Sequence, residues 1–150
     1  MRGAKRIVIG AVLAAVLVAA LPLTAGAASN PKEMRQKLLS LTNSARRNNG
    51  LRALELNWRL SHSAIRHSRR MAEQHTVYHT ANLYRLVRRW HPSVWGENVG
   101  MAGTVRQIHH VFMLSAPHRG NILRGGFSNA GIGVVHKGGR VWATVMFYGG

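Results

Sequence analysis

The residues that could perform acid–base or metal chemistry are unevenly represented in this sequence. The chain has nine histidines but only four acidic residues, and it contains neither aspartate nor cysteine. The acids are Glu33, Glu55, Glu73 and Glu97. A cysteine nucleophile is therefore excluded, and no Gly-x-Ser-x-Gly sequence presents a serine on a nucleophile elbow. Ser68 and Ser115 each have a histidine nearby, but proximity in sequence does not make a catalytic triad. The chemistry that remains is that of imidazole with a carboxylate.

Two of the histidines have a spacing that suits a shared site. His75 and His79 are four residues apart, so a helix would place both rings on one face. Zinc hydrolases with this spacing carry His-Glu-x-x-His, and here no glutamate follows His75. Phosphate-binding glycine loops are also absent, because the pairs Gly125-Gly126 and Gly138-Gly139 are isolated and indicate turns.

Three helices are predicted to position these residues. Asn30, Pro31 and Glu33 are typical of a helix start, and Asn48-Asn49-Gly50 of its end. A second helix starts at the capping residue Asn57, and a third starts at Thr104 and stops near Ala116-Pro117. Apolar spacing places one stripe of each of the first two helices inward: Met34, Leu38, Leu41 and Ala45 in the first, and Leu60, Ala64, His67, Met71 and His75 in the second.

The strands are predicted mainly at the C-terminal end. Residues 131–136 and 140–148 flank Lys137-Gly138-Gly139, which is typical of a β-hairpin with a tight turn. Residues 94–100 indicate a short strand or bulge. Residues 76–92 lose the helical period, so an irregular segment is expected, with aromatic side chains that could shape a groove. Helices followed by a small antiparallel sheet with an inserted helix predict an α+β domain.

Five short motifs, in order, resemble those of the CAP superfamily, which includes cysteine-rich secretory proteins, antigen 5 and pathogenesis-related 1 proteins. The similarity is to its bacterial SCP-like branch, which lacks disulfides. The resemblance implies an α-β-α sandwich with a central antiparallel sheet. The motifs are Ala64-Ile65-Arg66-His67-Ser68-Arg69-Arg70-Met71-Ala72, Tyr78-His79-Thr80, Gly96-Glu97-Asn98-Val99, Ser115-Ala116-Pro117-His118-Arg119-Gly120-Asn121-Ile122-Leu123 and Gly131-Ile132-Gly133-Val134.

The resemblance also implies a cleft with two histidines and two acids, which in some family members binds a divalent metal. The matching residues here are His79, Glu97 and His118, a candidate set for Zn²⁺. The second acid would lie near Ser115, and residues 105–117 contain no carboxylate. Hydrolysis therefore loses its expected base, while metal binding remains possible.

Each candidate residue also has a purely structural interpretation. Glu97 could pair with an arginine such as Arg119, and His79 and His118 could be histidines hydrogen-bonded to the backbone. His67 is expected to be structural, with Ser68 tying its helix to a loop. The segment Asn121-Ile122-Leu123 is expected to be a turn that fixes the site loop on the core.

The N-terminus has the three parts of a secretory signal peptide. Basic residues up to Arg6 precede an apolar run, Ile7 to Leu23, and Ala25-Gly26-Ala27 is a cleavage site. We therefore expect a signal peptide over residues 1–27 and a CAP (SCP-like) domain over residues 28–150. The alternative is that the apolar run is retained as a membrane anchor.

The chain is also strongly basic. The formal net charge of +17 falls to +14 once Arg2, Lys5 and Arg6 are removed with the signal peptide. Such a charge attracts polyanions, and the alternative is that it only keeps the protein soluble. For an exported protein, acidic cell-wall polymers or an anionic membrane surface are the expected partners, and nucleic acid is unlikely.

These observations predict a secreted protein of the cell envelope or extracellular space. The first hypothesis is a binding protein that holds a small lipid-like or sterol-like ligand, a divalent metal, or both, in the His/Glu cleft. By resemblance, the aromatic segment from Tyr78 to Trp95 would form one wall for a lipid. The alternatives are a metal-dependent hydrolase using the same cleft and a basic protein that binds polyanions, for example a cell-wall or antimicrobial protein.

Overall fold

The computed structural model describes residues 30–150, and the predicted signal peptide lies outside these residues. Ten helices and strands follow one another along the described chain. In order they are α1 (Pro31–Asn48), β1 (Glu55–Leu56), α2 (Trp58–Gln74), α3 (Leu83–Val87), η1 (Arg88–Trp90), β2 (Val94–Ala102), α4 (Val105–Leu114), α5 (Ala116–Ile122), β3 (Asn129–Lys137) and β4 (Arg140–Gly149).

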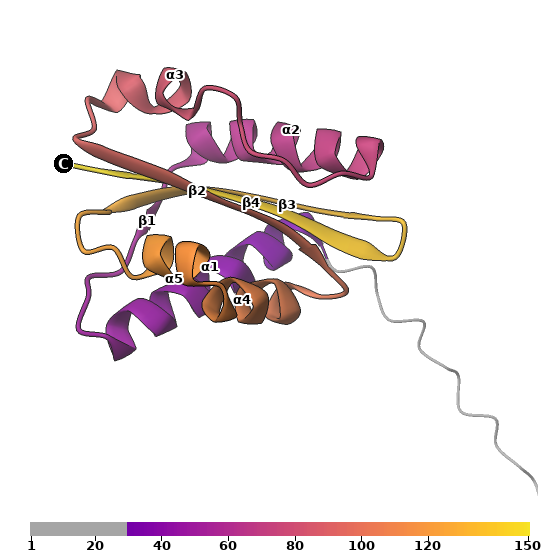
Figure 1. The fold of residues 1–150 in the computed structure, drawn as a ribbon, viewed down its shortest axis with the longest axis horizontal. Helices are drawn as coiled ribbons and strands as arrows, with labels where there is room; N and C mark the ends of the chain where they lie inside the picture. The colour runs from indigo at the N-terminus through magenta and orange to yellow at the C-terminus, as the bar shows by residue number, and fades with distance from the viewer. Residues whose placement is uncertain (1–29) are drawn as a thin grey trace, which may run out of the picture.

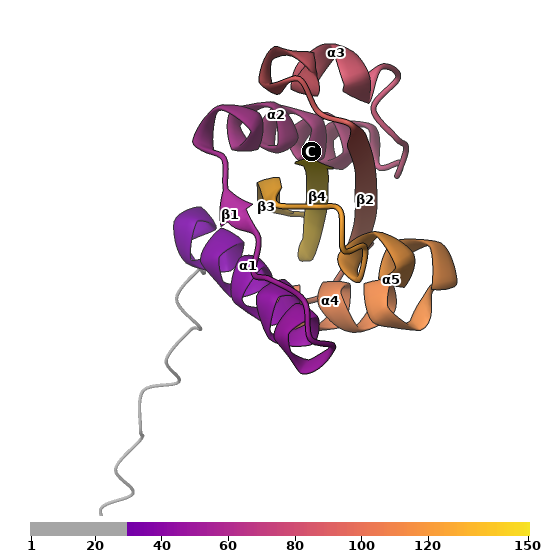
Figure 2. The same ribbon diagram turned by 90° about the vertical axis from the view of Figure 1, so that its left-hand side faces the viewer.

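The elements form three layers. The sheet has the strand order β1-β3-β4-β2, and only the short β1 pairs in the parallel direction. Helices α2 and α3 cover one face of the sheet, and α1, α4 and α5 cover the other (Figures 1 and 2). The predicted α+β class and the α-β-α sandwich are therefore confirmed. No helix within residues 30–150 has the length and apolar character needed to cross a bilayer.

The C-terminal hairpin forms as predicted. β3 and β4 pair along their length up to Lys137 and Arg140, and the two residues between them, Gly138 and Gly139, both have positive φ, at 60° and 69°. This backbone conformation is the one that favours glycine in a two-residue hairpin turn. β2 is longer than expected and pairs with β4 over nine residues, so it forms the edge of the sheet opposite β1.

Helix α2 lies unusually close to β3. A Cβ atom at Gly133 would overlap the backbone of Ala64 and Ile65, and one at Gly131 would overlap Leu60. The hydroxyl of Ser68 fixes the same contact, since its Oγ lies 3.1 Å from the carbonyl oxygen of Gly133 and 2.9 Å from the Thr144 hydroxyl. Ser68 therefore ties α2 to the sheet, whereas we predicted a tie to a loop.

The opposite layer is organised around a buried arginine. The side chain of Arg46, near the end of α1, is fully buried. Its Nε donates to the carbonyl of Arg52, Nη1 to those of Ile122 and Arg124, and Nη2 to that of Phe127, all at 2.8–2.9 Å. One guanidinium therefore fixes the segment that follows α1 and the connection between α5 and β3.

Two predicted segments differ from the structure. Residues 83–90 form α3 and η1 instead of an irregular segment, because the Asn82 side chain caps α3 by accepting from the amide of Arg85. The third predicted helix corresponds to α4, which ends at Leu114, and a further helix that was not predicted, α5, follows Ser115. Asn121 and Ile122 therefore end a helix, whereas we predicted a turn.

The close contact between α2 and β3 predicts that Gly133→Ala is strongly destabilising. The added methyl group would meet backbone atoms, which cannot rotate away, so we expect a loss of about 1–3 kcal/mol or more in the free energy of unfolding. Urea denaturation measures this. Gly120→Ala is the control, since nothing lies within 4 Å of its Cβ position and its site in α5 favours alanine. Equal midpoints for the two variants would contradict the prediction.

The buried guanidinium predicts a large effect for Arg46→Met. The apolar side chain reaches only about as far as Nε of arginine and leaves carbonyl oxygens without a donor, and each costs about 1–3 kcal/mol when buried. We therefore expect a loss of at least about 3 kcal/mol, measured by urea denaturation. Arg47→Met changes the exposed neighbour and should stay within about 0.5 kcal/mol of the parent protein. A similar stability for both variants would show that the Arg46 bonds contribute little.

Candidate functional site

The centre of the candidate site is the carboxylate of Glu97 on β2. Its side chain is only 5% exposed. Oε2 accepts from the backbone amide of Thr80 at 2.9 Å and lies 2.8 Å from Nδ1 of His79, and Oε1 accepts from the Thr80 hydroxyl at 2.6 Å. Both oxygens are therefore engaged, and Glu97 fastens the loop that follows α2 to the edge strand of the sheet.

His79 is the exposed member of the site. Its side chain is 62% exposed, although Nδ1 is held by Glu97. The contact leaves Nε2 as the ring nitrogen that is not bonded to Glu97. A carboxylate at one nitrogen fixes the orientation of an imidazole, and in metal sites it also makes the other nitrogen a better ligand. The geometry therefore leaves Nε2 as the atom of His79 that is available to a ligand.

His118 comes from α5, on the other side of the sheet edge. Its ring packs against Phe112, with 5.0 Å between the ring centroids, and its Nδ1 is buried without a hydrogen-bond partner among the described residues. Burial lowers the pKa of His118 below its ordinary value, and the neighbouring His79 lowers it further. A lowered pKa keeps the imidazole neutral at pH 7, the form that binds metal ions.

Two asparagines hold α5 against β2. Nδ2 of Asn121 donates to the carbonyl of Glu97 at 3.1 Å and to Oδ1 of Asn98 at 2.9 Å, and Nδ2 of Asn98 donates to the carbonyl of His118 at 2.9 Å. Gly96 permits this contact, because a Cβ there would lie 2.8 Å from the Asn121 side-chain oxygen. The segment Asn121-Ile122-Leu123 does fix the site loop, as we predicted, although Asn121 and Ile122 are helical.

The structure joins the three candidate ligands only in part. Glu97 contacts His79 directly, and His79 is close enough to His118 to lower the pKa of His118. Within residues 30–150, no group of three or more His, Cys, Asp or Glu side chains is placed to hold a metal ion. Zinc binding by His79, Glu97 and His118 together therefore stays a prediction.

Other expectations for this region are resolved by the geometry. Glu97 does not pair with Arg119, whose Nη1 instead donates to the carbonyl of Met113. His67 is structural as predicted, with Nε2 2.7 Å from the carbonyl oxygen of Tyr78. The predicted inward position of His75 is wrong, because it is exposed in the left-handed conformation that ends α2.

Two residues of the site, Thr80 and Asn98, were missed in the sequence. The bonds from Thr80 to Glu97 and the bonds of Asn98 join segments that are distant in the chain, and no local pattern signals them. Their only signal was membership of the motifs Tyr78-His79-Thr80 and Gly96-Glu97-Asn98-Val99. The segment Asn121-Ile122-Leu123 was identified, although not the groups to which Asn121 bonds.

The layered fold is that of SCP domains. An extracellular SCP-domain protein from Bacillus anthracis has the same fold, with a TM-score of 0.67 and 23% identity over 80% of this chain and 41% of that one. An outer surface protein of Borrelia burgdorferi matches with a TM-score of 0.72 and 17% identity, covering 80% of this chain and 95% of that chain.

The sequence comparison identifies the family. The model of the cysteine-rich secretory protein family, CAP, matches residues 39–147, and the chain belongs to this family. The uncharacterized protein YkwD of Bacillus subtilis is 30% identical over 133 residues, which cover 84% of this chain and 51% of that protein. The chain thus spans about half the length of this curated relative.

The contacts of Glu97 predict that Glu97→Gln loosens the loop at Thr80. An amide side chain has only one acceptor oxygen, so it cannot replace all three bonds, and the charge that strengthens them is lost. We expect hydrogen exchange at the Thr80 amide to accelerate at least about tenfold, because a hydrogen bond to a charged group contributes about 1.5–3 kcal/mol and ~1.4 kcal/mol already corresponds to a factor of ten.

The matched control for this measurement is Glu73→Gln, which removes the same charge from an exposed position on α2. Its Thr80 exchange rate should equal that of the parent protein. If Glu97→Gln left the Thr80 amide as protected as before, the carboxylate would not be what fastens the loop.

Proposed function

We propose that the protein is a CAP-domain binding protein that acts outside the cytoplasm and holds one divalent cation between His79 and His118. The observation that carries the proposal is the state of Glu97, whose two oxygens both accept hydrogen bonds from the His79–Thr80 segment. In this role Glu97 orients the His79 ring through Nδ1 and does not itself bind the cation. The cleft then presents two imidazoles to a ligand.

The two histidines suit a cation for different reasons. His79 is exposed and has Nε2 free of Glu97, while His118 is partly buried, neutral at pH 7 and has an Nδ1 without a partner among the described residues. Neutral imidazole suits zinc better than calcium or magnesium, which prefer oxygen ligands. When bound, the cation would supply a positive charge and open coordination positions for an anionic group or water.

Affinity is expected to be modest. Structural zinc sites use four protein ligands and catalytic sites usually three. The described residues place no third His, Cys, Asp or Glu side chain with the pair, so water or a second molecule would complete the coordination. A weak and exchangeable site suits capture of a ligand better than permanent stabilisation of the fold.

Hydrolysis is the weaker alternative. A metal-dependent hydrolase needs a base that can reach the metal-bound water. Glu97 is buried and bonded through both oxygens, and Ser115, near the position of the missing family acid, only connects α4 to α5. Glu55 lies on β1, at the opposite edge of the sheet from β2. These positions support binding over catalysis.

Action outside the cytoplasm is supported by the signal-like N-terminal sequence and by relatives of the same fold. The Bacillus anthracis protein is described as extracellular, and the Borrelia burgdorferi protein as an outer surface protein. A lipid-like ligand stays a prediction. The pocket next to the aromatic segment is lined by four arginines, which favours an anionic group over a lipid tail.

The proposal predicts saturable Zn²⁺ binding that depends on both histidines. Calorimetric titration of the metal-free protein should show one site, and a His79→Ala, His118→Ala double variant should show no saturable binding at concentrations that saturate the parent protein, because both imidazoles are gone. Glu97→Gln should weaken binding less, since it disturbs only the orientation of His79, and loss of a hydrogen-bond partner behind a ligand costs about 10–100-fold at most.

A matched control replaces two exposed histidines elsewhere, His62→Ala and His136→Ala, on α2 and β3. This variant should bind zinc like the parent protein. If both double variants lost the same amount of binding, the metal would be held by scattered surface histidines and the cleft proposal would be wrong.

A further inference from the structure

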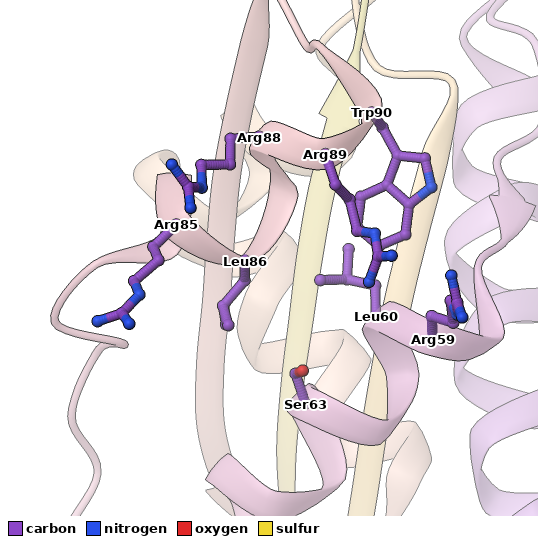
Figure 3. A pocket seen from close by; sticks show the side chains of 8 residues that line it. All are labelled: Arg59, Leu60, Ser63, Arg85, Leu86, Arg88, Arg89 and Trp90. Carbon is purple, nitrogen blue, oxygen red and sulfur yellow. The ribbon is translucent and has the colours of Figure 1, made fainter.

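The pocket lined by four arginines lies on the face of the domain covered by α2 and α3. It is a cavity of about 300 Å³ between α2 and the α3–η1 segment. Four arginines line it, with Trp90, two leucines and a serine: Arg59, Leu60, Ser63, Arg85, Leu86, Arg88, Arg89 and Trp90. We call this pocket the arginine groove (Figure 3). It shares no residue with the His79–His118 cleft.

The arginines of the groove have no counter-ions in the described part of the protein. Within residues 30–150 the only ion pair is that of His79 with Glu97, and none of the four guanidiniums donates a hydrogen bond to the protein. All four side chains are exposed. Placing like charges around one cavity is unfavourable, and a bound anion reverses this. The groove therefore has the electrostatics of an anion site.

One wall of the groove is packed against the sheet. The Trp90 ring stacks on Tyr148 at 5.1 Å between centroids, and the Tyr148 hydroxyl accepts from Nδ2 of Asn57 at 2.7 Å. On the groove side, Cζ of Arg89 lies 5.5 Å from the Trp90 centroid. Figure 3 shows Arg89 next to the Trp90 ring and directed towards α2, with Arg59 also close to that ring and Arg85 and Arg88 towards the other end. The guanidinium donors of the groove therefore lie beside a packed aromatic wall, with no protein group among the described residues to compete for them.

The chemistry of the groove favours phosphate. The guanidinium group presents a planar fork of donors that binds phosphate oxygens in pairs, and the Ser63 hydroxyl adds another donor to the lining. Nucleobases are disfavoured, because Trp90 is the only aromatic side chain in the lining and Tyr148 already stacks on its ring, so a strand of successive bases finds no row of aromatic rings. A bilayer surface is disfavoured, because the charges line a concave pocket and a flat sheet of headgroups cannot enter it.

We propose that the arginine groove binds a phosphodiester segment of an anionic envelope glycopolymer. Arg59 and Arg89 hold one phosphate next to Trp90, and Arg85 and Arg88 meet the next part of the chain. Charges at both ends of the groove fit a repeating anion better than a single free phosphate. The choice of an envelope polymer rests on the proposed location outside the cytoplasm, whereas phosphate recognition does not.

The test measures binding of poly(glycerol phosphate) oligomers to the full chain, in parallel with inorganic phosphate, phosphatidylglycerol vesicles and a single-stranded oligonucleotide. The variant is Arg59→Gln, Arg89→Gln. We expect the polymer to bind saturably and the variant to weaken it at least about tenfold, with a shallower salt dependence, since fewer counterions are released. Arg89→Lys keeps the charge but loses the fork, so it should give an intermediate loss.

The control is Arg47→Gln, Arg106→Gln, which removes the same charge from exposed positions on α1 and α4, in the layer on the other side of the sheet. It should weaken polymer binding less than about threefold, the part due to the general field. Equal losses in the two double variants would overturn the proposal, since net charge alone would then explain binding.

The other probes separate the remaining outcomes. Groove-dependent binding to vesicles or to the oligonucleotide, without polymer binding, would overturn the polymer in favour of a membrane or a nucleic acid. If inorganic phosphate bound to the groove as tightly as the polymer does, the claim that the groove recognises a repeating anion would be wrong. The His79→Ala, His118→Ala variant should bind polymer normally, and the groove variant should bind zinc normally. The zinc proposal and the polymer proposal can therefore fail independently, and the two sets of variants show which one has failed.

Discussion

The Arg46 guanidinium is the interaction on which the layer of α1, α4 and α5 depends. A charge taken out of water needs partners of comparable strength, and an ordinary protein supplies a carboxylate. Here the partners are four carbonyl oxygens, from Arg52, Ile122, Arg124 and Phe127. Burial lowers the pKa of Arg46, but arginine keeps its charge through such shifts. The carbonyls must therefore stay where the guanidinium needs them, and the chain segments that carry them are fixed too.

The candidate site depends on the segments that Arg46 fixes. Ile122 ends α5, and its carbonyl is one of the groups that Arg46 holds. The same helix carries His118 and Asn121, and Asn121 in turn bonds to Glu97 and Asn98 on β2. Edge strands leave backbone groups without partners, and at Glu97 the Asn121 amide supplies one. The position of His118 relative to His79 thus depends on a chain of hydrogen bonds that begins at the end of α1.

Sequence patterns predicted the parts of the fold that depend on neighbouring residues. The capping residues Asn30, Asn57 and Thr104 start helices as expected, and Gly138-Gly139 form the hairpin turn. Non-local contacts had no such signal. Arg46 lies on a helix whose apolar stripe already accounts for an inward face, so a buried cation there contradicts the usual rule for charged residues. In the site, the family motifs located His79, Glu97 and His118, but the role of Glu97 as a partner of Thr80 needed the three-dimensional structure.

The shortage of acids explains why the arginines fall into two groups. With four glutamates against 21 basic residues, most guanidiniums cannot have a carboxylate partner. Arg46 and Arg119 donate instead to backbone carbonyls and thereby become part of the architecture. Arg59, Arg85, Arg88 and Arg89 make no bond of this kind within residues 30–150, although a packed aromatic wall lies beside them. A guanidinium whose donors are not bonded to the protein can bind an anion without first breaking such a bond. Carboxylates are scarce in this chain, so Arg46 bonds to backbone carbonyls. For the same reason the arginines of the groove remain available to a ligand.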